Sequence, residues 1–394
     1  MTVFANNEVY AVKCSDYDQA ADKLGLLFSM MGGVGRFAAR DEKIVLKVNL
    51  LQPSRPEQAV CTHPAVVAAI GRMAKGQGAV ALIADSPGSG YKYDAKTLTA
   101  LYDASGMFGA AEGAGIGINL DTTYQPVSFQ EGKLIKRFEV ITPVLEADAV
   151  FNLCKLKTHM FMSMTGAVKN NFGVIPGLAK PGYHVKLRDK GHFADMLLDL
   201  AEYVSPRVSI MDAVVGMEGE GPGAAGAPRR IGLLLGSVNP LALDVVAGEI
   251  IGLKREQNPV LAAAALRGLA PTRIEEVSII GADISELRLS DYKFPSTIYE
   301  GMGMGKLPWW QRALVPFFKN GLSLTPQVIA KACLGCGICR DSCPVGAITV
   351  SKNKPMRARM DEQKCIRCYC CHELCPEKAI RLKKGLLYRR IMKE

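Results

Sequence analysis

The chain has 394 residues, of which 48% are hydrophobic and 22% are charged, and its formal net charge is +10. This length and apolar share predict two or three folded domains and argue against a disordered chain. The excess of Lys and Arg comes without a nucleic-acid-binding motif, so nucleic-acid binding is not expected. The sequence has neither a secretory signal nor a run of about 18 apolar residues. We therefore expect a cytoplasmic protein with no transmembrane segment, for which peripheral membrane contact stays open.

Residues 1–295 are predicted to form one large domain in which strand-like and helix-like segments alternate. The apolar runs and turn residues predict strands at 43–51, 80–85, 147–153, 208–215 and 231–235, an antiparallel hairpin at 127–140, and helices at 65–74, 241–251 and 260–269. Thr62 is the expected N-cap of the first helix, with Pro64 in its first turn. The alternation predicts an α/β fold with a mostly parallel sheet.

Polar side chains follow several of these strands, at the sheet edge where α/β proteins bind ligands. If the strand before them continues, its alternation places Lys155, Lys157 and His159 on one face. Lys169 and two asparagines come soon afterwards, and Asp212 precedes a glycine-rich loop. We interpret these five residues as a candidate catalytic site that binds a small anionic ligand.

The large domain carries no cofactor fingerprint. No G-x-G-x-x-G stands at a strand-to-helix junction, and neither a P-loop nor a G-x-S-x-G motif occurs. Whether the large domain binds a flavin or another organic cofactor therefore stays open. His63, His184 and His192 stand alone in the sequence and are interpreted as core or surface residues.

Residues 296–325 are predicted to connect the large domain to a small C-terminal domain. They contain Trp309, Trp310 and the pair Phe317–Phe318, with prolines that interrupt any long helix. Because such an aromatic cluster favours burial, we expect this connector to pack the small domain onto the large one. A surface facing a membrane or a partner is the alternative.

Residues 326–383 contain one cysteine pattern twice, 32 residues apart. The first copy is Cys333, Cys336, Cys339 and Cys343, the second is Cys365, Cys368, Cys371 and Cys375, and a proline follows each copy. This C-x₂-C-x₂-C-x₃-C-P spacing is typical of bacterial ferredoxins with two [4Fe–4S] clusters, in which the cysteine before the proline ligates the other cluster. The pattern predicts a ferredoxin-like α+β domain with two such clusters. Strands at 347–350 and 357–360 should pair, as should 326–331 and 379–382.

The cross-ligation assigns four cysteines to each cluster. One cluster takes Cys333, Cys336, Cys339 and Cys375, and the other takes Cys365, Cys368, Cys371 and Cys343. Zinc sites would use two C-x₂-C pairs, and disulfides do not suit a chain without a secretory signal. Cys370 is extra and is expected to be a spare thiol beside a cluster.

Residues 384–394 form a basic tail, the end of a positively charged stretch. Residues 352–394 contain 13 Lys or Arg and 5 Asp or Glu, an excess that offsets the negative charge of the clusters. We expect a solvated tail, with docking to an acidic partner or to lipid as the alternative.

Three strings in the large domain carry a family resemblance. They are K-L-K-T-H at 155–159, G-A-V-K-N-N-F-G at 166–173 and D-A-V-V-G-M-E-G-E-G-P at 212–222. With the two-cluster domain that follows, the chain resembles domain-of-unknown-function family 362 over nearly its whole length. The resemblance implies an α/β domain and bound iron–sulfur clusters, and it implies no reaction.

The two clusters predict single-electron transfer and leave three functions open. The first is an oxidoreductase that takes electrons from a redox partner protein and delivers them to a ligand in the large domain. There, Lys155, Lys157 and Lys169 would hold negative charge, and His159, titrating near neutrality, would supply a proton. The second is a dedicated carrier whose large domain only docks a partner. The third is a non-redox ligand-binding protein or isomerase with structural or sensing clusters.

Overall fold

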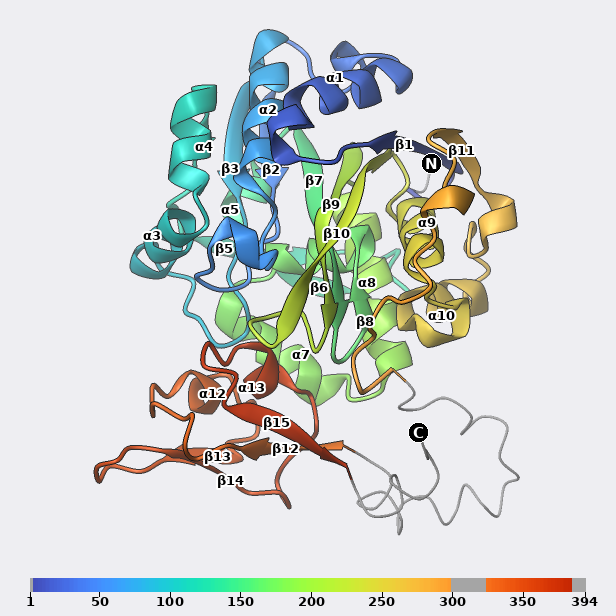
Figure 1. The fold of residues 1–394 in the computed structure, drawn as a ribbon. Coiled ribbons are helices and arrows are strands. Elements are labelled where there is room, and N and C mark those ends of the chain that lie inside the picture. The colour runs from blue at the N-terminus through green and yellow to red at the C-terminus, as the bar shows by residue number, and fades with distance from the viewer. Residues whose placement is uncertain (1–2, 299–323, 385–394) are drawn as a thin grey trace.

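The computed structural model describes residues 3–298 and 324–384, which form a large α/β domain and a small domain beneath it in Figure 1. The large domain is built on a nine-stranded sheet. In spatial order its strands are β11 (Ser278–Gly281), β1 (Glu8–Lys13), β10 (Gly226–Ser237), β9 (Val208–Gly219), β7 (Ala149–His159), β2 (Lys43–Lys47), β3 (Val80–Ala84) and β4 (Gly117–Ile118), and β8 (Ser163–Thr165) pairs with β7. Among the described residues, five of the eight pairings are parallel, which confirms the predicted mostly parallel α/β sheet.

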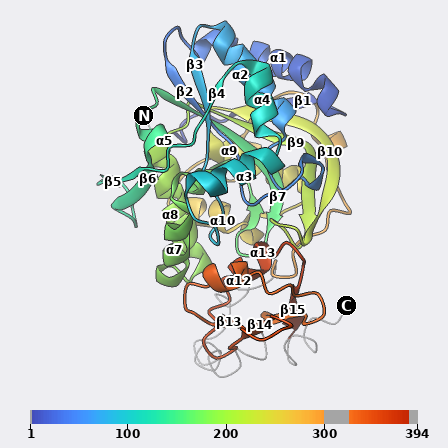
Figure 2. The same cartoon turned by 90° about the vertical axis from the view of Figure 1, so that its left-hand side faces the viewer.

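Helices cover both faces of this sheet (Figure 2). One face packs against α1 (Ala20–Met30), α2 (Pro64–Gly76), α3 (Ala95–Ala104) and α4 (Met107–Ala114). The other packs against α8 (Lys190–Val204), α9 (Pro240–Ile251) and α10 (Pro259–Leu266). Strand β2 illustrates why a buried parallel strand reads as an unbroken apolar run: Ile44 and Leu46 face the first set of helices, and Val45 faces the second.

Short elements complete the large domain. Strands β5 (Tyr124–Ser128) and β6 (Arg137–Ile141) form the predicted antiparallel hairpin. Three further helices are α5 (Thr142–Leu145), α6 (Ala167–Asn170) and α7 (Lys180–Lys186). The last two follow β8 closely, which places them beside the C-terminal end of β7.

The start of α2 differs from the sequence prediction, since His63 and not Thr62 is the N-cap. The Nδ1 atom of His63 accepts a hydrogen bond from the Ala65 amide, and Pro64 is the first helical residue. The Thr62 hydroxyl instead bonds the backbone of two other segments. It donates a hydrogen bond to the Leu153 carbonyl (2.7 Å) and accepts one from the Asn49 amide (2.9 Å). Asn49 thus bonds a side chain and not a neighbouring strand, and β2 ends at Lys47 and not at residue 51.

The small domain contains two strand pairs and two one-turn helices. β12 (Leu324–Val328) pairs with β15 (Ile380–Lys384), and β13 (Ile348–Val350) pairs with β14 (Ala358–Met360), as predicted. The helices are α12 (Ile338–Asp341) and α13 (Cys370–Glu373). Trp309, Trp310 and the phenylalanine pair of the predicted connector lie outside the described residues, so the connector and the domain boundaries stay predictions.

Glycines allow the small domain to sit against the large one (Figures 1 and 2). A Cβ atom at Gly223 would lie 1.8 Å from the Glu373 carbonyl oxygen. A Cβ atom at Gly88 would lie 2.8 Å from the Leu374 side chain. Contacts this close require glycine at both positions. They bring α13 onto the loops beyond the C-terminal ends of β3 and β9.

Candidate functional site

The eight patterned cysteines line two separate cavities in the small domain. One, which we call the first cysteine cavity, is lined by Cys333, Cys336, Cys339 and Cys375. The second cysteine cavity is lined by Cys343, Cys365, Cys368 and Cys371. Each cavity thus combines a triplet from one copy of the pattern with the cysteine before proline from the other copy.

Backbone amides point at several of these sulfur atoms. The Ala347 amide lies 3.2 Å from the sulfur of Cys343, and its equivalent 32 residues later, the Ala379 amide, lies 3.2 Å from that of Cys375. The Ala358 amide lies 3.3 Å from the Cys333 sulfur. Amide donors stabilise thiolates and tune the clusters that thiolates hold.

The two cysteine loops use left-handed backbone at matching positions. Gly335 and Gly337 have φ of +70° and +85°, and Arg367 and Tyr369, 32 residues later, have φ of 59° and 63°. Gly335 is additionally required by space, because a Cβ atom there would lie 2.5 Å from the Met356 carbonyl oxygen. The repeat in sequence is therefore a repeat in backbone conformation, which wraps each triplet around its cavity.

The donor set of these cavities fits an iron–sulfur cluster better than a single ion. Within residues 3–298 and 324–384, no three His, Cys, Asp or Glu side chains converge closely enough to hold one metal ion. A cubane spreads four thiolates over its corners, which suits four sulfurs around a cavity. Cys370 is buried and lines neither cavity.

A third cavity lies between the two domains, and we call it the interdomain cavity. Its volume is about 70 Å³. Predicted site residues Lys157, His159 and Lys169 line it, whereas Lys155 and Asp212 do not. Sequence reasoning missed Lys180 and Glu373, and it assigned His184 no role although this residue also lines the cavity.

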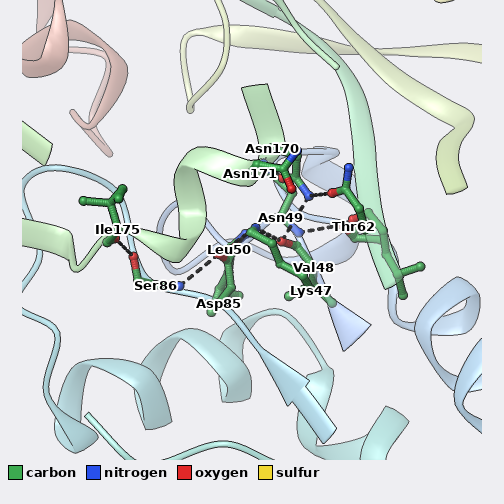
Figure 3. A network of polar contacts seen from close by, with 12 residues as sticks. Lys47, Val48, Asn49, Leu50, Thr62, Asp85, Ser86, Asn170, Asn171 and Ile175 are labelled. Carbon is green, nitrogen blue, oxygen red and sulfur yellow. Dashed lines mark hydrogen bonds and ion pairs between the residues drawn. The ribbon is translucent and has the colours of Figure 1, made fainter. Parts of the chain in front are cut away.

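A buried network beneath the interdomain cavity fixes the loops after β2 and β3 (Figure 3). The Asp85 carboxylate accepts a hydrogen bond from the Lys47 ammonium group (2.8 Å). It also accepts hydrogen bonds from the backbone amides of Leu50 (2.7 Å) and Ser86 (2.9 Å). A Cβ atom at Gly173 would lie 2.0 Å from an Asp85 carboxylate oxygen, so only glycine fits there. Asp85 is therefore fully engaged in structure, and its charge is offset by Lys47.

Two buried lysines of the interdomain cavity are anchored to neutral oxygen atoms. Lys157 donates to Asn49 Oδ1 (2.6 Å) and to the Val60 carbonyl, and Lys180 donates to the hydroxyl and carbonyl oxygens of Ser86. Burial lowers the pKa of each of these two lysines to about 7. Neither ammonium group has a carboxylate partner among the described residues.

Lys169 is the cavity lysine with the fewest contacts. In the described part of the chain it makes no hydrogen bond or ion pair, and its ammonium group lies 5.2 Å from the centre of the Phe172 ring. The Lys180 ammonium group lies 6.0 Å from the centre of the same ring. Burial lowers the pKa of Lys169 as well.

His159 joins the large domain to α13. Its Nδ1 atom accepts hydrogen bonds from the backbone amides of Phe161 (3.1 Å) and Met162 (3.3 Å). The proton of the neutral ring is therefore on Nε2. The same Nδ1 atom lies 3.2 Å from Glu373 Oε1. Burial, followed by the nearby charge of Lys169, holds the pKa of His159 well below its usual value. Burial also raises the pKa of Glu373 to about 8. The expectation that His159 titrates near neutrality is therefore wrong; its neutral ring can donate a hydrogen bond from Nε2.

Lys155 and Asp212 form a separate buried cluster. The Lys155 ammonium group lies 2.8 Å from Asp212 Oδ2, and the Tyr17 hydroxyl donates to Asp212 Oδ1 (3.0 Å). The register between β7 and β9 shifts after Lys155, and this irregularity separates the partners of Lys155 from those of Lys157. The irregularity lies in β9, because Lys155 pairs with Asp212 and Lys157 with Met217, whereas β7 runs unbroken from Ala149 to His159.

Comparisons with known proteins give a family and one relative. The family model described as a domain of unknown function (DUF362) matches residues 44–249, and the model described as a 4Fe-4S dicluster domain matches residues 332–379. A thylakoid-associated protein from Synechocystis sp. is 32% identical over 283 residues, which cover 70% of this chain and 83% of the relative.

One solved structure is similar at low identity. The lactate racemase apoprotein from Thermoanaerobacterium thermosaccharolyticum superposes with a TM-score of 0.35 and 13% identity, over 53% of this chain and 51% of that one. This chain therefore spans about half the length of that structure, and nothing about function is drawn from the likeness. Within the described residues, no helix is long and apolar enough to cross a membrane.

Proposed function

Because the chain belongs to the DUF362 family and carries a 4Fe-4S dicluster domain, we propose that this iron–sulfur protein is an oxidoreductase that passes single electrons through two [4Fe–4S] clusters to a ligand in the interdomain cavity. Each cluster supplies one-electron chemistry when bound. The first cysteine cavity holds one cluster and the second holds the other, with the ligands that line each cavity.

The observation that carries this proposal is the position of α13. This one turn of helix bears Cys371, which lines the second cysteine cavity, and Glu373, which lines the interdomain cavity. The two side chains are two residues apart on the same turn. This turn of helix would therefore connect a cluster held by Cys371 with a ligand in the interdomain cavity.

Electrons reach the clusters from a redox partner protein at the first cysteine cavity. Cys336 is exposed, and the neighbouring Leu334 is 67% exposed. An apolar side chain beside an exposed ligand is suited to brief docking of an electron donor. We propose that the partner docks there, where Cys333, Cys336, Cys339 and Cys375 would hold a cluster able to accept its electron.

The large domain contributes binding and orientation. Lys157 and Lys169 provide positive charge to the ligand, and His159 donates a hydrogen bond from Nε2. Lys155 and Asp212 act indirectly, because their buried pair holds β7 and β9 together. A flavin or other organic cofactor has no assigned place.

The test compares two acceptors for electrons stored in the clusters. Holoprotein is reduced with dithionite, freed of excess reductant under anaerobic conditions, and mixed with a small-molecule extract or with the protein fraction of the source cells. We expect the small-molecule extract to restore the oxidised cluster absorbance. The control is Cys343→Ala, which removes a ligand of the second cluster and is expected to abolish this reoxidation.

Reoxidation by the protein fraction alone would contradict the proposal and favour the dedicated carrier. Clusters that dithionite cannot reduce would instead favour the non-redox ligand-binding protein or isomerase. The expected cytoplasmic location stays a prediction, and the thylakoid association in the name of the Synechocystis relative is a reason to include peripheral membrane contact in it.

A further inference from the structure

More lysines than carboxyl groups line the interdomain cavity. Three lysines line it, at positions 157, 169 and 180. Two acidic residues also line it: Asp85 is paired with Lys47, whereas Glu373 lies against the neutral ring of His159 and interacts electrostatically with Lys169. Among the described residues none of the three lysines has a carboxylate within ion-pair distance, and buried charges in proteins are normally paired, so a further anion would fit here.

Two further polar atoms that line the cavity are buried without a partner. The hydroxyl of Thr165 and the Nδ1 atom of His184 make no hydrogen bond among the described residues. Thr165 stands opposite Lys157 in the β7–β8 pair, so both side chains are on the same face of the sheet. Such orphaned groups are costly unless a ligand or ordered water satisfies them.

The surroundings of His184 hold it in place as a neutral hydrogen-bonding group. Its ring stacks on Phe193 with the centroids 4.6 Å apart, and burial lowers the pKa of this imidazole to about 3. A neutral imidazole offers one N–H to an oxygen acceptor. The hydroxyl of Thr165 offers another donor, and Lys169 offers an ammonium group that makes no ion pair among the described residues.

The size of the cavity limits what it can hold. A volume of about 70 Å³ has room for roughly five to seven water-sized groups, at about 10–15 Å³ each. This suits one compact charged group and excludes a whole nucleotide or flavin from the enclosed part of the site.

We propose that the interdomain cavity binds the oxyanion group of a small molecule, a carboxylate or a phosphate, with Lys169 as its charge partner and Thr165 and His184 as hydrogen-bond donors. This inference rests on the proposed function, since it names the chemical class of the ligand that receives the electrons. The carboxylate and phosphate arms of the test below separate the two sources of oxyanion.

The test is isothermal titration calorimetry of oxidised, anaerobic holoprotein with oxalate and, separately, with inorganic phosphate. We expect at least one of them to bind, and Lys169→Met to weaken that binding roughly tenfold or more, because a charged hydrogen bond is lost. Thr165→Val, which keeps the side-chain shape, should also weaken it. The matched control is Lys186→Met, which removes the same charge. Lys186 is exposed and lies on the same helix as His184.

Absence of binding by both anions, or equal loss in the Lys169→Met and Lys186→Met variants, would overturn the inference. Iron content and circular dichroism verify that each variant is folded and loaded. Because calorimetry of oxidised protein involves no electron transfer, its failure is distinguishable from failure of the proposed function, which the reoxidation experiment measures.

Discussion

Replacing Cys343 with alanine is expected to lower the iron content of anaerobically purified protein from about eight atoms per chain to about four. Cys343 lines the second cysteine cavity with the later triplet, although it belongs to the earlier copy of the pattern. Its loss should therefore empty the second site and leave the first one filled. Iron and sulfide analysis gives the count, and electron paramagnetic resonance of the reduced protein identifies the surviving cluster.

Double variants separate cross-ligation from ligation within each copy. Cys343→Ala combined with Cys365→Ala removes two ligands of one proposed site, so about four iron atoms should remain. Cys343→Ala combined with Cys339→Ala removes one ligand from each site, and close to none should remain. The opposite pattern would show that each copy holds its own cluster. Cys370→Ala is the matched control and should retain about eight, because Cys370 lines neither cysteine cavity.

Replacing Asp212 with alanine is expected to lower the free energy of unfolding by about 3–5 kcal/mol. The change leaves the Lys155 ammonium group buried without its carboxylate, and it removes the acceptor of the Tyr17 hydroxyl and of the His63 amide. Urea unfolding of the large domain, followed by circular dichroism, measures the difference.

The control for Asp212 is an exposed ion pair. Asp291 bonds Arg229 at 2.6 Å, but its side chain is 68% exposed, so Asp291→Ala should change the free energy of unfolding by less than about 1 kcal/mol. If Asp212→Ala protein is stable but no longer binds oxalate or phosphate, Asp212 belongs to the binding site. That result would contradict its structural role.

The cysteine spacing and the apolar runs predicted the architecture well, because both depend on local sequence. Spacing predicted the strand pairs of the small domain, and apolar runs predicted β2, β3, β7, β9 and β10 of the large one but missed β1, β4, β8 and β11. The ends of β2 and α2 were predicted less well. They depend on Thr62, whose hydroxyl bonds the Leu153 carbonyl, a partner far away in the sequence.

The interdomain cavity was only partly predictable for the same reason. Lys157, His159 and Lys169 follow a predicted strand, so their positions at the sheet edge could be inferred. Lys180 lies on a different segment and reaches Ser86, 94 residues away. Glu373 joins the cavity only because the small domain docks onto the large one, and no local pattern encodes that docking. Sequence alternation also could not reveal the register shift in β9, which gives Lys155 and Lys157 distant partners on that strand.

The proximity of the second cluster to a ligand in the interdomain cavity is measured most directly by pulsed electron–nuclear double resonance. Reduced protein is saturated with ³¹P-phosphate or ¹³C-oxalate, whichever binds in the calorimetric test, in variants that retain one cluster. We predict a nuclear coupling in Cys375→Ala protein, which keeps the second cluster, and none in Cys343→Ala protein, which keeps the first. Coupling in Cys343→Ala protein alone, or in neither variant, would contradict the path from the second cluster into the cavity.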